Sequence, residues 1–281
     1  YASTKLSQLG FNFRGAAANA LTNIQTNLQS VVSDEESVLS LDHFLIYANT
    51  LSLSTSFVHR LLTIEILEEN PKLLHDNFPF SDNALQLTSK VKACEELICK
   101  QTSRLQTWLV KFLFENNVMK KVRAMTTNIL VNGNENCYVS GADDFESLSS
   151  MNEFVAKWKS MMIPFQNVLY EDVYTGLLTL VVDYIVKILE QRIWALKVNE
   201  LGATKLDREL SLLIKTVCAL NYTLREKFTK LTQIVLILGF DDDNFDVSTA
   251  DIKEEIVSSM KWVLSPQERI AARALKVDKR H

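Results

Sequence analysis

The sequence is poor in the two residues that most often interrupt regular structure. Its 281 residues include only 7 glycines and 4 prolines, whereas globular proteins average roughly 7% glycine and 5% proline. Hydrophobic residues make up 47% and charged residues 23% of the chain, as in a folded globular protein of one large or two smaller domains. We therefore expect long uninterrupted elements, which helices tolerate better than sheets do.

Several classes of function lack their usual signals. The chain has 30 basic and 34 acidic residues and a net charge of −4, without the basic excess that nucleic-acid binding needs. No apolar run approaches the roughly 20 residues of a membrane-spanning helix. No G-x-S-x-G, G-x-G-x-x-G or Walker A pattern occurs. We expect no catalysis, no cofactor and no nucleic-acid partner.

Cysteine and histidine give no metal-binding pattern either. His43 and His59 point to nearly opposite sides of one predicted helix, and Cys94 and Cys99 also diverge, so neither pair suits zinc. The surroundings in sequence of Cys94, Cys99, Cys137 and Cys218 are apolar and mostly helical. We therefore expect reduced, buried thiols in a cytosolic protein. Because the chain begins at Tyr1 without a start Met or a signal-peptide pattern, we expect an excised fragment.

The helical period of 3.6 residues dominates what is present. Residues 15–31 read as a helix, and Ser33 with Glu36 forms a capping box for a second helix that we expect to end near residue 69. One apolar face of the first helix holds Ala20, Ile24, Leu28 and Val31; the stripe of the second holds Leu41, Leu45, Ala48, Phe57, Leu61 and Leu62.

The clearest break in the helical pattern is the stretch 131–150. It has two Gly, several Asn and Asp, and no period. Before it, residues 82–130 form a long helical region with a bend or a short turn at Asn116-Asn117. We predict an all-α protein with one helical bundle over residues 1–150 and a C-terminal helical bundle over residues 151–281.

The second half continues the helical pattern. We expect an interruption at Pro164, and a C-cap at Gly202 before a helix that starts at Thr204 or Asp207. The apolar stripe of that helix is Leu213, Val217, Leu220, Leu224, Phe228, Leu231, Val235 and Leu238. Near its end "IVLIL" is apolar on all sides, so it should be buried on all sides.

The stretch "DDNFD", residues 242–246, matches the DDxxD pattern with which all-helical terpenoid synthases bind Mg²⁺ and a diphosphate. Asp242, Asp243 and Asp246 would be the ligands of such an enzyme. However, Gly239 ends the preceding helix and no second Asp-rich motif accompanies the first. We therefore favour a solvated acidic loop, with the diphosphate enzyme as an alternative.

Roughly the last 115 residues resemble a known family. "VLYEDVYTGLLTLVVDYIVKILEQRIW" is followed by Asp-x-Glu-Leu at Asp207–Leu210, Arg-x-Lys-Phe-x-x-Leu-x-Gln at Arg225–Gln233 and Leu-x-Pro-x-Glu at Leu264–Glu268. In this order the motifs resemble the C-terminal end of the fourth subunits of the conserved oligomeric Golgi complex, a family of vesicle tethers. The first 160 residues resemble the family more weakly. We expect a fungal member.

The resemblance implies an elongated rod of antiparallel helical bundles, of which this chain would be the last two. It implies a non-catalytic, peripheral protein on the cytosolic face of Golgi membranes that supports retrograde intra-Golgi transport and recycling of glycosylation enzymes. The implied partners are other subunits of the same lobe, Golgi SNAREs, a SNARE chaperone or a Rab GTPase, with indirect membrane contact. A helical subunit of a sister tethering complex is an alternative.

The family commonly has Arg at the position of Lys230 and an acidic residue at that of Glu268, which suggests an ion pair between two helices. Two local alternatives exist. Glu226 lies four residues before Lys230 and can pair with it, and Glu268 is the N3 residue of a capping box at Ser265-Pro266. The candidate structural or interaction residues are Lys230, Glu268, Arg225, Phe228, Leu231, Trp262, Asp207 and Glu209.

Overall fold

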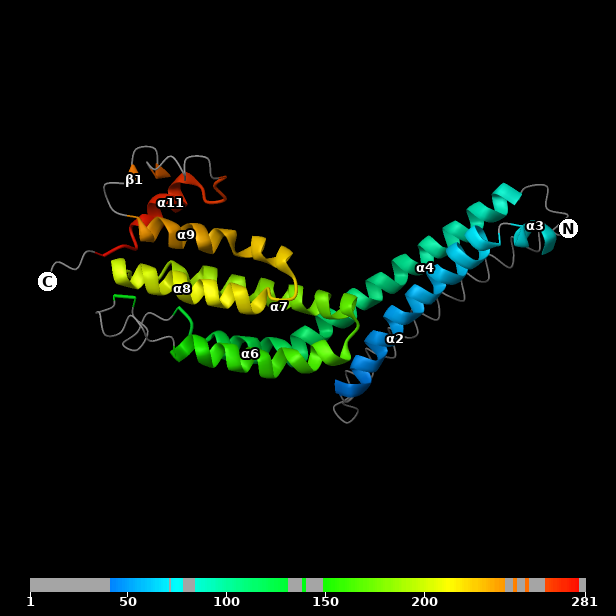
Figure 1. Cartoon of the computed structure of the whole chain (residues 1–281), viewed down its shortest axis with the longest axis horizontal. Helices are drawn as coiled ribbons and strands as arrows, with labels where there is room; N and C mark the ends of the chain where they lie inside the picture. Colours follow the sequence, from blue (N-terminus) through cyan, green and yellow to red (C-terminus); the bar gives the residue numbers. More distant parts are fainter. Residues whose placement is uncertain are drawn as a thin grey trace. The chain divides into compact units, whose positions relative to one another are not determined.

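The structure, a computed structural model, describes residues 41–70, 72–77, 84–130, 138–139, 149–240, 245–246, 251–252 and 261–277. The predicted all-α class is confirmed: apart from one pair of two-residue strands, the regular elements of these residues are helices (Figure 1). Several predictions fall outside the described residues, namely the helix over 15–31, the capping box at Ser33 and Glu36, Cys137, Asp242 and Asp243.

Contacts divide the chain into two compact units. The first unit contains the described residues up to Leu113 together with Gln166–Gly176, and the second contains Phe114–Phe165 and Leu177–His281. These units are defined by which residues contact one another. They do not test the predicted boundary near residue 150 between two separately folding bundles. The two-domain division therefore stays a prediction.

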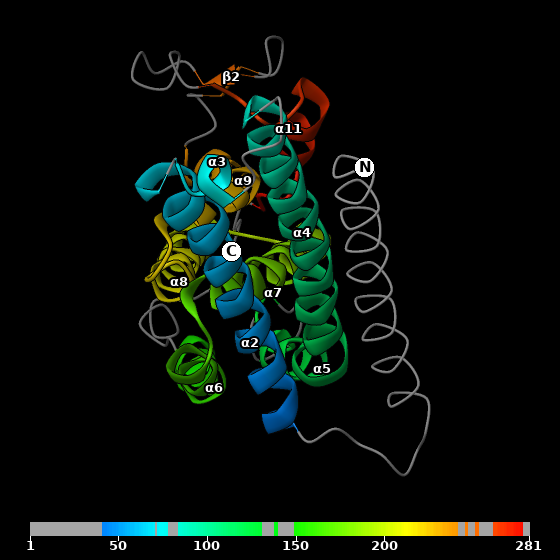
Figure 2. The ribbon, with the colours of Figure 1, turned by 90° about the vertical axis from the view of Figure 1, so that its right-hand side faces the viewer.

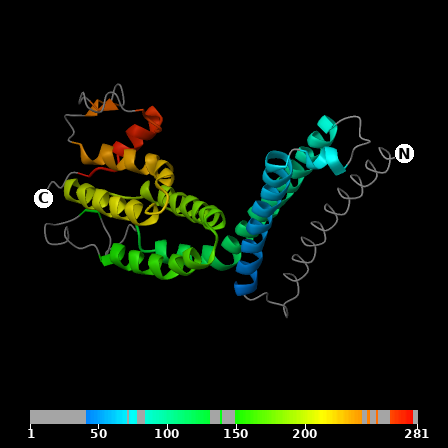
Figure 3. The same cartoon turned by 45° about the vertical axis from the view of Figure 1, so that its right-hand side comes forward.

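The first unit is built on the helices α2 (Leu41–His59) and α4 (Ala84–Leu113), which lie side by side in all three views (Figures 1, 2 and 3). Its elements are α2 (Leu41–His59), the π-helical η1 (Arg60–Glu69), α3 (Leu73–Asn77), α4 (Ala84–Leu113) and the first turns of α7 (Glu171–Ile193). Phe112 of α4 stacks on Phe44 of α2, with ring centroids 5.5 Å apart. The stripe predicted for this region is partly wrong, because Leu45 and Ala48 are buried while Leu41, Phe57 and Leu61 are exposed.

Polar side chains fasten the start of α7 to α2 and α4. Ser52 Oγ and Gln106 Nε2 both donate hydrogen bonds of 2.7 Å to the Asp172 carboxylate. Asn49 Nδ2 donates to the Val168 carbonyl at 2.6 Å, and Asn49 Oδ1 accepts from the Tyr170 amide at 2.9 Å. These bonds place residues 168–170 beside the middle of α2.

The second unit is packed around helix α7. Its other elements are the π-helical η2 (Phe114–Val118), α5 (Met119–Thr126), α6 (Ser149–Val168), α8 (Glu200–Val217), the 3₁₀ helix η3 (Tyr222–Phe228), α9 (Thr229–Gly239), β1 (Phe245–Asp246), β2 (Asp251–Ile252) and α11 (Pro266–Arg273). The α7 side chains Val181, Val182, Ile185 and Leu189 have no exposed surface. Asp183 and Lys187 of the same helix are exposed, so α7 is amphipathic and its apolar face turns to the core of the unit.

Two predictions concerned helix breaks. At Asn116-Asn117, where a bend or a short turn was expected, the chain forms a π-helical turn, η2, between α4 and α5. The interruption predicted at Pro164 is wrong, because α6 continues through this residue. Proline removes the hydrogen bond to the carbonyl four residues earlier, that of Ser160. Ser160 is exposed, so water can bind this carbonyl at little cost.

The single helix predicted from residue 204 to 238 is also wrong, because the chain turns after α8. Asn221 Oδ1 accepts a hydrogen bond of 3.1 Å from the Thr223 amide and caps η3, which continues into α9. Leu220 falls in this break and is 57% exposed, whereas the other positions of the predicted stripe are buried. The buried "IVLIL" stretch is confirmed for Ile234, Val235, Ile237 and Leu238.

Gly202 was predicted as a helix C-cap and instead lies in the first turn of α8. Asn199 is the N-cap of α8, and its Oδ1 accepts a 2.8 Å hydrogen bond from the Gly202 amide. A Cβ on Gly202 would lie 1.5 Å from the carbonyl oxygen of Tyr138. Parallel bridges join Tyr138 to Val198 and Val198 to Lys276, so three distant segments meet here. The periodicity of the sequence cannot report such a backbone contact.

Candidate interaction site at the junction of α9 and α11

The residues of the predicted Lys230–Glu268 pair lie on neighbouring helices, with α9 between α8 and α11 (Figures 1 and 3). The start of α11 follows from its sequence. Ser265 is the N-cap, Pro266 is the first helical residue, and the capping box predicted with Glu268 forms. The Ser265 amide donates to Glu268 Oε2 at 2.9 Å, and the Glu268 amide donates to Ser265 Oγ at 3.3 Å.

Glu268 also pairs with Lys230. Lys230 Nζ lies 2.7 Å from Glu268 Oε1, and the two side chains are 30% and 36% exposed. The carboxylate therefore serves the capping box with one oxygen and the cross-helix pair with the other. The hydrogen bond from Lys230, with those from Ser265, lowers the pKa of Glu268 to about 2. The bond to Glu268 raises the pKa of Lys230 above its ordinary value.

A buried glutamine joins the segment before α11 to α9. Gln233 is 3% exposed. Its Oε1 accepts from the amides of Val263 at 2.9 Å and Leu264 at 3.2 Å, and its Nε2 donates to the Lys261 carbonyl at 3.0 Å. One side chain thus satisfies three backbone groups of an irregular segment, of which the Leu264 amide is buried.

Two basic side chains from the C-terminal part of the chain cap the end of α9. Arg273 Nη1 donates to the carbonyls of Ile237 at 3.0 Å and Phe240 at 2.6 Å, and Lys276 Nζ donates to Phe240 at 2.8 Å. The last carbonyls of a helix lack partners within the helix, and cations are favoured there. Together with Gln233, these contacts fix where α11 lies against α9.

The other candidate residues have different surroundings. Phe228 and Leu231 have no exposed surface, so they act through packing. Arg225 is exposed, with its guanidinium carbon 4.8 Å from the centre of the Tyr222 ring. Trp262 is half-buried under the guanidinium of Arg269, 4.9 Å from the ring centre. Asp207 is exposed on α8. The structure therefore gathers Lys230, Glu268 and Trp262 at the junction and leaves Asp207 and Arg225 outside it.

Glu209 is 4% exposed and belongs to the interior of the second unit. The Tyr138 hydroxyl donates a hydrogen bond to the Glu209 carboxylate. Burial raises the pKa of Glu209, although this hydrogen bond and the charge of Lys205 act in the opposite direction. Burial also raises the pKa of the Tyr138 hydroxyl. The pair joins Tyr138, which lies between α5 and α6 in the chain, to the middle of α8.

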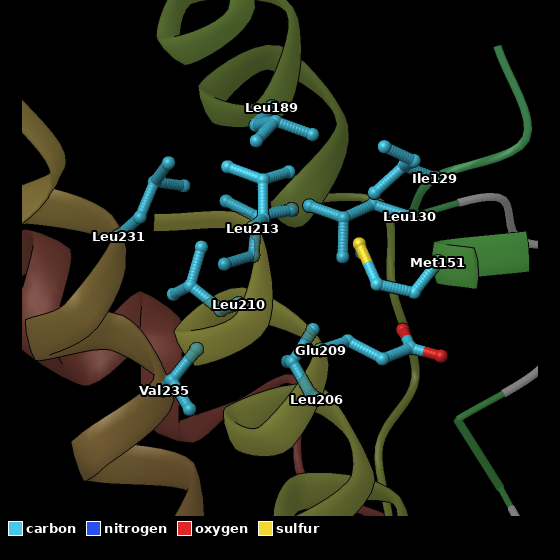
Figure 4. Close-up of a pocket in the computed structure, with 11 residues that line it drawn as sticks. Ile129, Leu130, Met151, Leu189, Leu206, Glu209, Leu210, Leu213, Leu231 and Val235 are labelled. Atoms are coloured by element: carbon cyan, nitrogen blue, oxygen red, sulfur yellow. The ribbon is translucent and has the colours of Figure 1, made fainter. Parts of the chain in front are cut away.

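The stem of Glu209 lines a small apolar cavity in the core of the second unit (Figure 4). The cavity measures ≈ 10 Å³, which is about the space of one water molecule. In Figure 4 the Glu209 carboxylate points away from Leu210, Leu231 and Val235. The remaining lining consists of Leu, Ile and Val side chains and Met151.

Sequence reasoning missed Gln233, Arg273, Lys276 and Gly202 as structural residues. Gln233 ends the Arg-x-Lys-Phe-x-x-Leu-x-Gln motif, and its place among apolar neighbours was the available signal. Arg273 and Lys276 carried none, because their carbonyl partners lie more than 30 residues earlier in the chain.

Over the described residues, no helix combines the length and apolar character required to cross a bilayer. Nor do these residues bring three or more His, Cys, Asp or Glu side chains into a group suited to a metal ion. Asp246 lies in β1, whereas Asp242 and Asp243 are not described, so the alternative of a diphosphate enzyme gains no support.

Comparisons with known proteins agree with the resemblance. A family model described as "Conserved oligomeric Golgi complex subunit 4, C-terminal" matches residues 44–271. The chain is similar to conserved oligomeric Golgi complex subunit 4 of Saccharomyces cerevisiae, 50% identical over 301 residues, which cover 99% of this chain and 35% of the yeast protein. The bovine protein of the same name is 24% identical over 278 residues, 94% of this chain and 35% of that protein. Its Arabidopsis thaliana counterpart is 31% identical over 106 residues, 37% of this chain and 14% of that protein. The chain thus spans only about a third of the yeast and bovine relatives.

Proposed function

Because the chain belongs to the family of conserved oligomeric Golgi complex subunit 4, in its C-terminal part, we propose that it is a non-catalytic part of a vesicle-tethering complex at the Golgi. It supports retrograde intra-Golgi transport, and with it the recycling of glycosylation enzymes, as a scaffold for protein–protein contacts. The observation that carries this function is the 50% identity to the yeast protein over 99% of the chain. The higher identity to the yeast than to the bovine protein indicates a fungal member.

The geometry of the second unit supports a scaffold. The junction of α9 and α11 combines a capping box, an ion pair whose side chains are about a third exposed, and a glutamine bound to backbone groups. Each of these contacts positions a helix, and none has the arrangement of a nucleophile beside a base. A rigid helical surface suits recognition by other proteins with little movement of the backbone.

The partners are other subunits of the same lobe of the complex, with Golgi SNAREs, a SNARE chaperone or a Rab GTPase as further candidates. We place the protein on the cytosolic face of Golgi membranes as a peripheral component whose membrane contact is indirect. Family membership also favours this complex over a sister tethering complex, which was the alternative from sequence.

A rescue assay tests the proposed function. Cells that lack the subunit receive the full-length protein, or the same protein without the region that corresponds to residues 1–281. Cell-surface glycans are then measured by lectin binding. We expect only the intact protein to restore the glycans, because recycling of glycosylation enzymes requires the tether.

Expression and complex assembly are the controls. The shortened protein must accumulate to the level of the intact one, and co-purification shows which other subunits it retains. Full rescue by a stably expressed shortened protein would contradict the proposal and assign tethering to the rest of the subunit. Co-purification with a different tethering complex would contradict the identity of the partners.

A further inference from the structure

Helix α5 of the second unit concentrates positive charge on its outer side. Lys120, Lys121 and Arg123 lie within about one turn of the helix, and all three are exposed. The opposite side is buried and includes Val122 and Met125. At 100° per residue, the three basic side chains share an arc of about 160° that excludes these buried ones. The three residues are named here the basic face of α5.

Acidic side chains of the described residues do not neutralise this basic face. Residues 116–134 contain no Asp or Glu, so no basic residue of the face has an acidic neighbour three or four positions away on the helix. The ion pairs among the described residues include none of the three. Glu153 of α6, to which Asn128 at the end of α5 is hydrogen-bonded, is paired with Lys157 at 2.5 Å.

Contacts at the end of α5 hold the basic face in a fixed direction. Arg192 of α7 donates through Nη1 to the carbonyls of Thr126 at 2.6 Å, Thr127 at 2.9 Å and Ile129 at 3.0 Å. The last carbonyls of a helix lack partners within it, so this side chain both caps α5 and attaches it to α7. The guanidinium also adds positive charge at the C-terminal end of α5.

The fold itself gains nothing from this arrangement of charge. Lys120 and Arg123 are three residues apart, and like charges at that spacing weaken a helix slightly. Single exposed lysines are ordinary on a protein surface, where both signs are usually interspersed. A cluster of one sign on a rigid helix favours contact with a surface of the opposite sign, because such complementarity speeds association and selects the partner.

We propose that the basic face of α5 binds an acidic segment of another subunit of the tether. This inference rests on the proposed function, which supplies other subunits as neighbours. Helix α5 has 8 residues and is about 12 Å long, which suits a short segment with a few Asp or Glu side chains. Arg123 can bind one carboxylate through two N–H groups. An anionic membrane suits the face less, since polybasic membrane sites gather about 4–8 Lys or Arg.

Photo-cross-linking in the assembled complex tests the contact. Cells that lack the subunit express the full-length protein with the photoreactive residue p-benzoylphenylalanine in place of Ala124, an exposed position among the three basic residues. After irradiation, mass spectrometry of the purified complex identifies the linked peptide. We expect a peptide of another subunit that contains several Asp or Glu residues. The same photoreactive residue in place of Ala219, exposed after α8, is the control and should not link to that peptide.

Charge reversal shows whether the basic side chains make the contact. Lys120→Glu/Lys121→Glu should lower the cross-linked fraction at least about fivefold. The matched control, Lys159→Glu/Lys215→Glu, changes the net charge equally at separate exposed positions and should leave the fraction unchanged. Since all four side chains are exposed, both variants should melt within about 2 °C of the wild type. Lysines in place of the acidic residues of the linked peptide should restore the link to the reversed α5.

Each other outcome overturns the proposal in its own way. A link to lipid would assign the basic face to the membrane, and a link within the same chain would show that the subunit covers the face itself. Equal cross-linking after charge reversal would exclude the basic side chains as its cause. No link in a complex that retains its other subunits would leave the face to solvent. These results leave the proposed function intact, whereas a wild-type subunit that co-purifies with none of the complex would contradict that function.

Discussion

The two sides of α9 are held by different kinds of contact. Toward α8, Leu231 and Val235 meet leucines across the apolar core (Figure 4). Toward α11, the contacts are the Lys230–Glu268 pair, the hydrogen bonds of Gln233, and the capping of the last carbonyls by Arg273. Burying one large apolar side chain contributes about 1.5–3 kcal/mol, and one hydrogen bond about 0.5–1.5 kcal/mol net. The apolar side therefore supplies most of the stability, and the polar side determines where α11 lies.

The largest expected effect is on the apolar side. Phe228→Ala should lower the free energy of unfolding by about 3–5 kcal/mol, because Phe228 is fully buried and its removal leaves a cavity. Chemical denaturation measures the change. Leu220→Ala is the matched control, since Leu220 is 57% exposed and should cost less than about 0.5 kcal/mol. Similar losses for both variants would contradict the placement of η3 and α9.

A backbone contact gives the next largest effect. Gly202→Ala should cost about 3 kcal/mol, because the added methyl group overlaps the Tyr138 carbonyl and the segment must move. Gly239→Ala is the control: a Cβ there meets nothing within 4 Å. This variant should be neutral or slightly stabilising. If both glycines tolerate alanine, α8 does not begin against Tyr138.

Removal of the buried amide should have an intermediate effect. Gln233→Met keeps the length of the side chain but leaves the backbone groups of Lys261, Val263 and Leu264 without this partner. We expect a loss of about 1–3 kcal/mol and faster hydrogen exchange at the amides of residues 263 and 264. Gln267→Met, at an exposed position of α11, serves as the comparison. Unchanged exchange would show that water replaces the glutamine, and the polar side of α9 would be weaker than described.

The smallest effect is expected from the ion pair. A double-mutant cycle with Lys230→Met and Glu268→Gln isolates the pair, because glutamine also suits the capping box. Both side chains are about a third exposed, so solvent screens the pair and the coupling should be about 0–1 kcal/mol at pH 7. A coupling above about 2 kcal/mol would make the polar side a main source of stability and overturn the comparison.

The pair should also depend on pH. The folded-state pKa of Glu268 is lowered to about 2 from 4.5, so its contribution is complete above pH 4.5 and is lost as the pH falls toward 2. The folded-state pKa of Lys230 is raised above 10.5, so its contribution is complete below pH 10.5 and is lost at higher pH. The coupling measured at pH 7 should therefore largely disappear near pH 2. A coupling that persists there would show that the carboxylate charge is not its source.

Local signals predicted much of the fold and part of the site. The start of α11 followed from Ser265, Pro266 and Glu268, since a capping box needs only residues three apart in the chain. The burial of α9 followed from its apolar run. The turn at Asn221 was missed, because the apolar stripe keeps its spacing through the break and hides it.

By itself, the sequence determined the helical class, the positions of most helices and the family, because these depend on local spacing and on motifs read along the chain. Tertiary structure alone decided that Glu268 meets Lys230, that Gln233 binds three backbone groups, and that position 202 has no room for a side chain. These contacts join residues that are tens of positions apart. Periodicity reports which face of a helix is apolar, but only packing decides which element lies against it.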